Sequence, residues 1–486
     1  MFQAKTKIVF FYLVSVLFIL LNAWFLVMKH SMVINALPIA FLIVALAVFS
    51  FDKLLYLIVF CTPLSIPLSE LMRGLPINMF LPTEPLLFGV LLVFILKVSA
   101  LGKFDREILR HPVSLAIYFS LIWILITSLT STMPVVSLKF LLSRIWFIVG
   151  FYLLTAKLFE SGKNIEKFVW LYTIPLLIVI FYATYRHLGY GLWDKQAAHF
   201  VVDPFYNDHT AYGAAVAMYL PFLFGFSFTK LYSPGVRIFV RIALGIVFMG
   251  LILSYARAAW VSMMAAFVIW AIMRLKIRFQ PLFLTFLISL SVILVFQNQI
   301  MMYLERNNTE SSANLADHVS SISNVSSDAS NLERLNRWSC AIRMFKDKPV
   351  FGYGPGTYMF NYAPYQLSAN RTIISTNSGD GGNAHSEYLG PMAESGFMGL
   401  VTFLVFLIVV IYTGIHAYSR TNDKRLKTIV MGALLGLITY FIHGIMNNFL
   451  DTDKLSVPYW GFSAIIVAID IYTRKIQSES VSEIKA

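Results

Sequence analysis

Four side chains in the second half of the chain have the chemistry of a site that handles phosphate and a hydroxyl group. Arg257, Arg334 and Arg337 carry planar guanidinium groups, which match phosphate oxygens and stay cationic at every relevant pH. His385 carries an imidazole, the side chain best suited to take a proton from an attacking hydroxyl near neutral pH. We therefore expect the arginines to bind a lipid diphosphate and the histidine to activate a hydroxyl.

The position of Arg257 favours phosphate binding over a purely structural role. Arg257 lies in Ser254–Trp260, a turn so short between two apolar runs that the guanidinium must sit at or just inside a membrane interface. A charge at that depth is costly unless it is paired or functional. The structural alternative is an arginine that snorkels or pairs with a carboxylate. For Arg334 and Arg337 the structural alternative is a solvated surface charge.

His385 is expected to start a helix that re-enters the membrane, which would place its imidazole at the bilayer edge. The structural alternative is a polar helix cap, a task that Asn383 or Ser386 could equally perform. Glu394 follows in the same helix, where a carboxylate needs a partner such as an arginine. We expect a structural or supporting role for Glu394 rather than that of a catalytic base.

The elements that position these residues must be membrane helices. The chain has 486 residues, of which 58% are hydrophobic and 13% are charged, and so few polar groups cannot cover the surface of a water-soluble domain. A spanning helix needs about 20 apolar residues. The expected fold is an all-α polytopic bundle of 12–14 transmembrane helices with one large periplasmic loop that contains short helices. Fourteen apolar segments begin near Ile8, Val33, Leu54, Phe80, Pro112, Val136, Phe168, Thr210, Val236, Trp260, Pro281, His385, Leu426 and Val457.

Basic residues set the expected orientation. Lysines and arginines recur in every second loop, which predicts that these loops and both termini are cytoplasmic. The same distribution explains the net charge of +13 without a nucleic-acid partner. The least certain spans form the hairpin from Leu54 to Leu96, because five prolines interrupt it and could leave a short or re-entrant pair. The sequence contains no CxxC motif and no Cys/His cluster, so we expect no zinc site.

The chain divides into five expected regions. Residues 1–202 form amino-terminal transmembrane helices, 203–298 a core with the Arg257 turn, 299–384 a large periplasmic loop, 385–474 the last transmembrane helices, and 475–486 a cytoplasmic tail. Inside the loop, residues 307–331 are a Ser- and Asn-rich insertion. A helix with an apolar face follows over residues 332–345, and the glycines of residues 352–356 predict a tight turn.

Four segments resemble, in order, the bacterial O-antigen ligase and polymerase family. HSEYLGPMAESGFMGL (His385–Leu400) looks like its H-[NS]-x-x-L-x(4)-E-x-G signature, and SYARAAW (Ser254–Trp260) resembles its S-x-x-R-[GA]-x-[WL] turn. Glu333–Tyr358 resembles its R-L-x-x-W…G-x-G-x-G stretch, with Arg334 rather than Arg337 as the motif arginine. Asp203–His209 looks like its outer loop F-x-N-x-[NH]. The insertion is a departure from the family pattern.

The resemblance implies a metal-independent, inverting glycosyltransferase without a cofactor in the bacterial inner membrane. Its donor would be a glycan on undecaprenyl diphosphate, held by Arg257 and Arg334 with Arg337 nearby, and His385 would activate the acceptor hydroxyl. Glu394, Tyr388, Asn207 and His209 would support these residues.

The resemblance leaves the acceptor open. The lipid A core or another glycan acceptor would make the protein a ligase, and a lipid-linked repeat unit would make it an O-antigen or exopolysaccharide polymerase. The alternative of another class is a lipid-linked glycan flippase or transporter. The spans contain few charges and the polar candidates gather at one face, which favours an enzyme.

Overall fold

The computed structural model describes residues 2–29, 33–71, 79–102, 104–229, 232–275, 329–367 and 382–485, and most of them are helical. The described chain divides into two units, residues 1–57 and 58–486. In the first, α1 (Phe2–Lys29) is long enough to cross a membrane. The short η1 (Val33–Asn35) precedes α2 (Ala36–Phe49), whose 14 apolar residues extend only about 21 Å at 1.5 Å per residue. The span predicted near Val33 is therefore shorter than expected.

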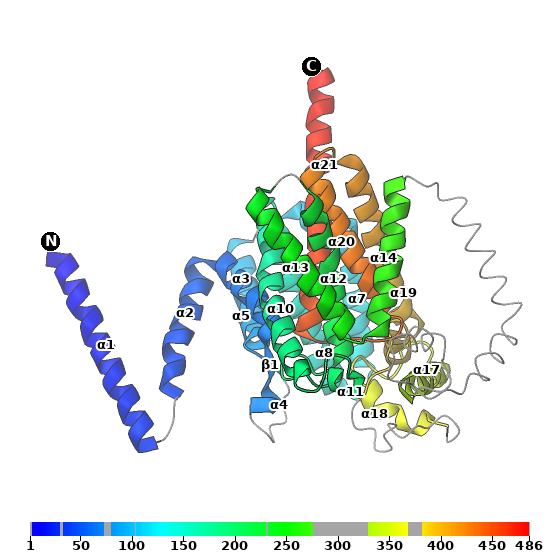
Figure 1. Cartoon of the computed structure of the whole chain (residues 1–486), viewed down its shortest axis with the longest axis horizontal. Coiled ribbons are helices and arrows are strands. Elements are labelled where there is room, and N and C mark those ends of the chain that lie inside the picture. Colours follow the sequence, from blue (N-terminus) through cyan, green and yellow to red (C-terminus); the bar gives the residue numbers. More distant parts are fainter. Residues whose placement is uncertain are drawn as a thin grey trace, which may run out of the picture. The chain divides into compact units, whose positions relative to one another are not determined.

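The second unit is a bundle of long apolar helices (Figure 1). Its long helices are α5 (Thr83–Leu101), α7 (Pro112–Leu129), α8 (Pro134–Ile148), α10 (Lys163–Leu188), α12 (His209–Phe228), α13 (Pro234–Leu253), α14 (Arg257–Leu275), α19 (Leu389–Arg420), α20 (Lys424–His443) and α21 (Asp453–Lys485). Helix α8 continues through the π-helical η3 (Val149–Leu154) into α9 (Thr155–Leu158). The short helices are α4 (Leu68–Leu71), α6 (Arg106–Leu109), α11 (Lys195–Ala198), α18 (Tyr358–Asn361) and the 3-10 turn η4 (Ala363–Tyr365). Helix α17 (Ala329–Asp347) has 19 residues but is not apolar enough to be a candidate span.

Eleven helices among the described residues are long and apolar enough to span a membrane. The protein is therefore a multi-pass, all-α membrane protein, as predicted. Most expected starts agree with the structure: α7 begins at Pro112, and α12 begins one residue before Thr210. The span predicted from Pro281 and the insertion up to residue 328 lie outside the described residues.

The proline-rich hairpin is short in its first arm only, because its second arm, α5, is long and apolar enough to span a membrane. Helix α3 (Phe51–Cys61), which crosses the boundary between the units, has only 11 residues before the 3-10 turn η2 (Thr62–Leu64). Two two-residue strands follow, β1 (Ile66–Pro67) and β2 (Phe80–Leu81), and they pair antiparallel. Pro63 and Pro67 each lack a backbone donor, which explains why the helix does not continue.

The centre of the second unit is formed by α12, α20 and α21, each mostly buried. Small residues allow the close packing: a Cβ on Gly436 of α20 would lie 2.6 Å from the carbonyl oxygen of Met218 on α12. We call the end of the bundle that carries residues 203–209, 254–257, 382–388 and 444–452 the site end. The amino terminus of α12 and the carboxyl terminus of α20 both lie there, so the packing of these two helices brings their polar ends together.

Helix α19 is broken near its start by Gly396, which has φ 69°. The predicted glycine turn packs on this break: the N–H of Gly354 donates to the carbonyl oxygen of Glu394 at 2.7 Å. Gly352, Gly354 and Gly356 all have positive φ, as the turn prediction required. A Cβ on Gly352 would lie 2.3 Å from the carbonyl carbon of Glu394, so only glycine fits this approach.

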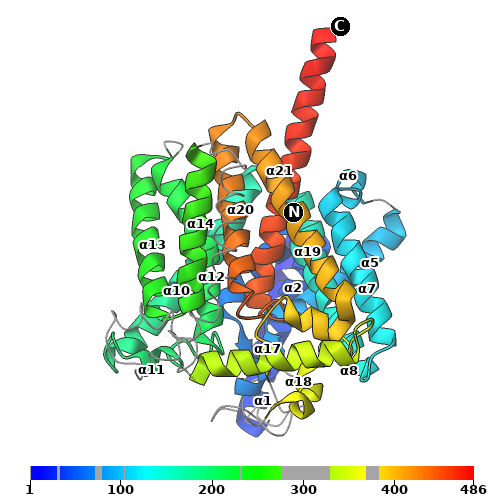
Figure 2. The same cartoon turned by 90° about the vertical axis from the view of Figure 1, so that its right-hand side faces the viewer.

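Helix α17 lies crosswise over the site end (Figure 2). Its apolar face was predicted at Leu335, Trp338, Ala341, Ile342 and Phe345, but this prediction is only partly right. Ala341 is buried, whereas Leu335 and Ile342 are exposed. The buried face of α17 instead includes polar side chains. They pair with one another across successive turns of the helix and with side chains of the loop beside it.

Candidate functional site

His385 does not start a helix, contrary to the prediction. Its φ of 49° is in the left-handed region, which a helix cannot contain, and α19 begins four residues later at Leu389. The hydroxyl of Ser386 accepts from the N–H groups of Tyr388 and Leu389 at 3.2 and 3.3 Å, so Ser386 is the residue that caps the helix start. The histidine thus belongs to a tight loop at the site end.

Hydrogen bonds fix the backbone of His385 on both sides. Its N–H donates to the side-chain oxygen of Asn383 at 3.0 Å, and its carbonyl oxygen accepts from the indole of Trp338 on α17 at 3.1 Å. Burial, with the nearby guanidinium groups of Arg334 and Arg337, lowers the pKa of His385 to about 4. The imidazole is therefore neutral near pH 7 and has a free lone pair to accept a proton.

The two arginines of α17 have different surroundings. The Nε of Arg337 donates to the carboxylate of Glu333 at 2.6 Å, and its guanidinium lies 3.9 Å from the centre of the Tyr362 ring. Its side chain is only 5% exposed. The half-buried Arg334 has electrostatic interactions with both His385 and His443. The structure therefore brings Arg334 to the histidines, and Arg337 lies inside the loop region against Glu333.

The segment before α12 reaches the same place. The Asp208 carboxylate accepts from the N–H of Thr210 at 2.7 Å and so caps α12. The Nδ1 of His209 lies 3.3 Å from this carboxylate, and the His209 ring packs 4.0 Å from that of His199. Asp208 interacts electrostatically with His385, whereas the neighbouring Asn207 is exposed.

Sequence reasoning missed His443, the last residue of α20. His443 is 1% exposed and lies within electrostatic reach of Asp208, Arg334 and His209. Its Nε2 is 3.2 Å from the side-chain amide nitrogen of Asn447, which is equally buried. The available signal was a histidine at the end of an apolar run, followed closely by two asparagines.

Arg257 is the first residue of α14, at the same end of the bundle. The turn before it is locked by Ser254, whose hydroxyl donates to the carbonyl oxygen of Leu251 at 2.7 Å, and by the positive φ of Tyr255. Ala256 packs against α12 so closely that a Cβ on Gly213 would lie 2.5 Å from the Cβ of Ala256. Gly213 is four residues, or about one helical turn, after His209 in α12. The half-buried Arg257 therefore begins a helix that packs against α12 about one turn from His209.

The side chains of Glu394 and Tyr388 form hydrogen bonds with backbone groups. The Glu394 carboxylate accepts from the N–H of Tyr358 at 2.8 Å and also from that of Gly356. The expected arginine partner is replaced by peptide N–H groups of the glycine-turn segment. The Tyr388 hydroxyl donates to the carbonyl oxygen of Phe441 at 2.9 Å, which ties the start of α19 to α20.

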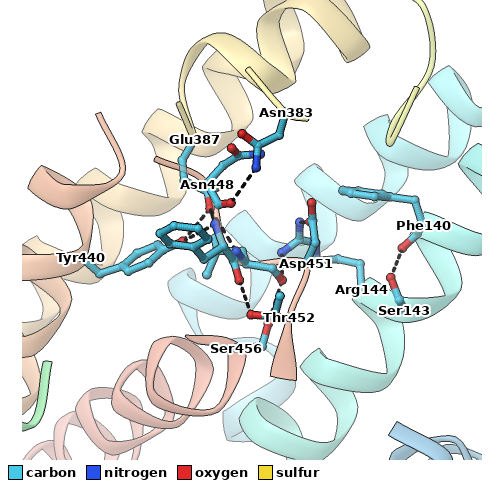
Figure 3. A network of polar contacts seen from close by, with 12 residues as sticks. Phe140, Ser143, Arg144, Asn383, Glu387, Tyr440, Asn448, Asp451, Thr452 and Ser456 are labelled. Atoms are coloured by element: carbon cyan, nitrogen blue, oxygen red, sulfur yellow. Dashed lines mark hydrogen bonds and ion pairs between the residues drawn. The ribbon is translucent and has the colours of Figure 1, made fainter. Parts of the chain in front are cut away.

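Glu387 is a second residue that sequence reasoning missed. One oxygen of its carboxylate accepts from the Tyr440 hydroxyl at 2.6 Å and from the N–H groups of Phe449 and Leu450 at 2.9 and 3.1 Å (Figure 3). Burial, with a smaller contribution from Asp451, raises the pKa of Glu387 to about 7. The residue therefore joins the His385 loop to α20 and to the loop before α21.

A family model described as O-antigen ligase matches residues 242–404. This part of the chain is therefore similar to the O-antigen ligase family. It contains Arg257, Arg334, Arg337, His385 and Glu394, whereas Asn207 and His209 lie before it. A comparison with curated proteins gave no match. Within the described ranges of the chain, no three His, Cys, Asp or Glu side chains gather as metal ligands would.

Proposed function

We propose that the chain is a membrane glycosyltransferase that moves a glycan from undecaprenyl diphosphate to an acceptor hydroxyl at the periplasmic face, in lipopolysaccharide or exopolysaccharide biosynthesis. The observation that carries the proposal is the electrostatic interaction of a half-buried, neutral imidazole, His385, with the cationic Arg334 at the site end, inside the segment that resembles O-antigen ligases. A base and a phosphate-binding cation side by side suit glycosyl transfer from a diphosphate.

The residues have complementary parts in a single displacement. Arg257 and Arg334 bind the diphosphate and stabilise the charge that grows on it as the bond to the anomeric carbon breaks. The neutral His385 takes the proton of the acceptor hydroxyl as its oxygen attacks that carbon from the opposite face. Undecaprenyl diphosphate leaves, and the configuration inverts. Arg337, paired with Glu333, positions α17 so that Arg334 and Trp338 reach the His385 loop.

The distribution of charge supports a periplasmic position for the site end in a bacterial inner membrane, with both termini cytoplasmic. Two short loops at the site end, residues 130–133 and 444–452, contain no lysine or arginine. The turn between α19 and α20, at the other end, is flanked by Arg420, Lys424 and Arg425. This asymmetry agrees with the rule that short cytoplasmic loops are rich in basic residues.

The test is the size of the product formed by purified protein in liposomes. The donor is an undecaprenyl-diphosphate oligosaccharide, supplied with or without lipid A core, and His385→Ala is measured beside the wild type. We expect a product that depends on His385. Addition only when the core is present identifies a ligase, and a ladder from donor alone identifies a polymerase. Equal product from His385→Ala, or none from the wild type, would contradict the proposal.

A further inference from the structure

A cleft opens at the site end, beside the loop that carries His385. Its polar walls are Arg144, Asn383, Glu387, Glu394, Asn448 and Asp451. Glu387 is only two residues from His385, yet its charged neighbours are Asp451 and Arg144, whereas those of His385 are Arg334, Arg337, Asp208 and Glu333. The strongest interactions of the two side chains therefore involve different charged residues, which lie on different sides of the loop.

The polar groups of this cleft are held in place by the protein. One nitrogen of the Arg144 guanidinium donates to Asp451 at 3.1 Å and the other to the carbonyl oxygen of Leu450 at 3.2 Å (Figure 3). The Asn383 amide donates to the backbone carbonyl oxygen of Asn448 at 3.3 Å. The side-chain oxygen of Asn448 is buried and has no hydrogen-bond partner among the described residues. A hydroxyl donor from a ligand would satisfy it.

The charge of the cleft distinguishes its ligand from a diphosphate. Three carboxylates, Glu387, Glu394 and Asp451, surround one guanidinium that is already paired with Asp451. Such a site offers a phosphate no unpaired cation, whereas carboxyl, amide and guanidinium groups together can both accept from and donate to sugar hydroxyls. The arginines on the other side of the loop have the opposite preference.

An apolar extension continues from the polar walls into the bundle. It shares Arg144, Glu387 and Glu394 with them and runs past Leu121, Phe403 and Trp460 of α7, α19 and α21. These side chains lie in helices long enough to span the membrane. The cleft therefore has a polar head region and a hydrocarbon-lined tail region, which is the shape of a glycolipid site.

We propose that this cleft binds the acceptor as a glycolipid, with its sugar hydroxyls against Arg144, Glu394 and Asn448 and its hydrocarbon chain in the apolar extension. This inference rests on the proposed function, because it divides that reaction between two sides of one loop. The diphosphate of the donor binds on the Arg334 side, and the acceptor enters from the Arg144 side. Residues 383–387 form the wall between them and carry the base.

A binding experiment tests the cleft without turnover. The probe is dodecyl maltoside with a photoreactive diazirine in its alkyl chain, added to the protein in lipid nanodiscs. We expect labelled peptides that contain Leu121, Phe403 or Trp460, and competition by unlabelled dodecyl maltoside but not by dodecyl phosphate. Labelling spread evenly over lipid-facing helices would overturn the inference, as would equal competition by the phosphate.

Gly390 offers a variant that fills the cleft, because it lines the polar walls and an added Cβ would meet only the Cβ of Ala384, at 3.7 Å. Gly390→Leu should lower specific labelling about tenfold. Gly245→Leu is the matched control, since Gly245 is an exposed glycine in α13 with nothing within 4 Å of an added Cβ. Both changes replace a helical glycine by a better helix former. Equal labelling of the two variants would contradict the assignment.

Turnover separates this inference from the proposed function. In the reconstituted reaction, Gly390→Leu should raise the acceptor KM about tenfold and leave the donor KM unchanged. His385→Ala should lose transfer but keep the maltoside labelling. A wild type that transfers glycan while Gly390→Leu keeps a normal acceptor KM overturns the acceptor site alone. If the wild type is labelled specifically but transfers no glycan, the glycolipid site is retained and the proposed function is overturned.

Discussion

The indole of Trp338 donates a hydrogen bond to the carbonyl oxygen of His385 at 3.1 Å, across 47 positions of sequence. This bond connects α17 to the loop that holds the proposed base. It also explains how His385 keeps a left-handed backbone, since its carbonyl group and its N–H are both held by partners outside the residue. The geometry of the base therefore depends on a helix that itself lies outside the bundle.

Trp338→Phe should slow transfer roughly fivefold, because one net hydrogen bond of about 1 kcal/mol would no longer hold the His385 loop. Initial rates in liposomes measure this effect. Trp170→Phe is the control, since Trp170 packs against Phe226 and Phe239 toward the end of the bundle opposite the site end. A Trp338→Phe rate equal to that of the wild type would show that the bond has no influence on the base.

The buried pair of Arg337 and Glu333 should matter for stability. Arg337→Met leaves the Glu333 carboxylate buried without its cation, a change that costs about 3–5 kcal/mol in comparable sites. We expect a lower apparent Tm in detergent by size-exclusion chromatography after heating. The double variant Glu333→Gln/Arg337→Met should recover part of the loss. If the double variant were less stable than Arg337→Met, the pair would not be the cause.

Gly396→Ala should prevent folding of most of the protein. The backbone there has φ 69°, and a Cβ would lie 2.1 Å from the carbonyl oxygen of Val350. Alanine would therefore push the glycine turn away from the break in α19. The yield of monodisperse protein from membranes measures this, and Gly245→Ala, which has open space, is the control. Normal yield of Gly396→Ala would contradict the close packing seen here.

The sequence was informative where local chemistry decides the structure. Hydrophobic length placed α7 and α12 within a residue of their starts, and the glycines of residues 352–356 correctly predicted positive φ. The pairing of Arg337 with Glu333 was also readable, because the two are four positions apart in a helix. It was missed because Arg337 was expected either to bind phosphate or to be exposed to solvent.

Non-local packing decided what the sequence could not reveal. Glu387 finds its partners in Tyr440, Phe449 and Leu450, which depends on how α19, α20 and the loop before α21 meet. His443 joins the site for the same reason. The start of α19 was misplaced because a left-handed φ at His385 is imposed by Trp338 and Asn383, neither of which a helical pattern reveals.

The acid limb of the pH profile should reflect His385. Burial and the two arginines of α17 lower its pKa to about 4, so the neutral base is present above that pH, and kcat/KM should fall only below it. For the wild type the readout is kcat/KM against pH. Arg334→Met removes a positive charge that disfavours imidazolium, so the pKa of His385 should rise in this variant. Because the variant is expected to lose transfer, its His385 pKa is measured by an NMR titration of the imidazole, which needs no turnover. A pKa that stays in place or falls in Arg334→Met would contradict the proximity of the two groups.

Arg257→Ala should abolish transfer while the protein inserts and folds normally, and Arg334→Ala and His385→Ala should do the same. The reason for Arg257 is its position at the start of α14, where the guanidinium and the partial positive charge of the helix amino terminus act on the same anion. Arg257→Lys keeps the charge but loses the fork of donors, so it should retain a small part of the rate. Arg237→Ala, in the first turn of α13 at the opposite end, is the matched control. Binding of undecaprenyl diphosphate should weaken with Arg257→Ala and stay normal with Arg237→Ala; wild-type activity in Arg257→Ala would remove this arginine from the diphosphate site.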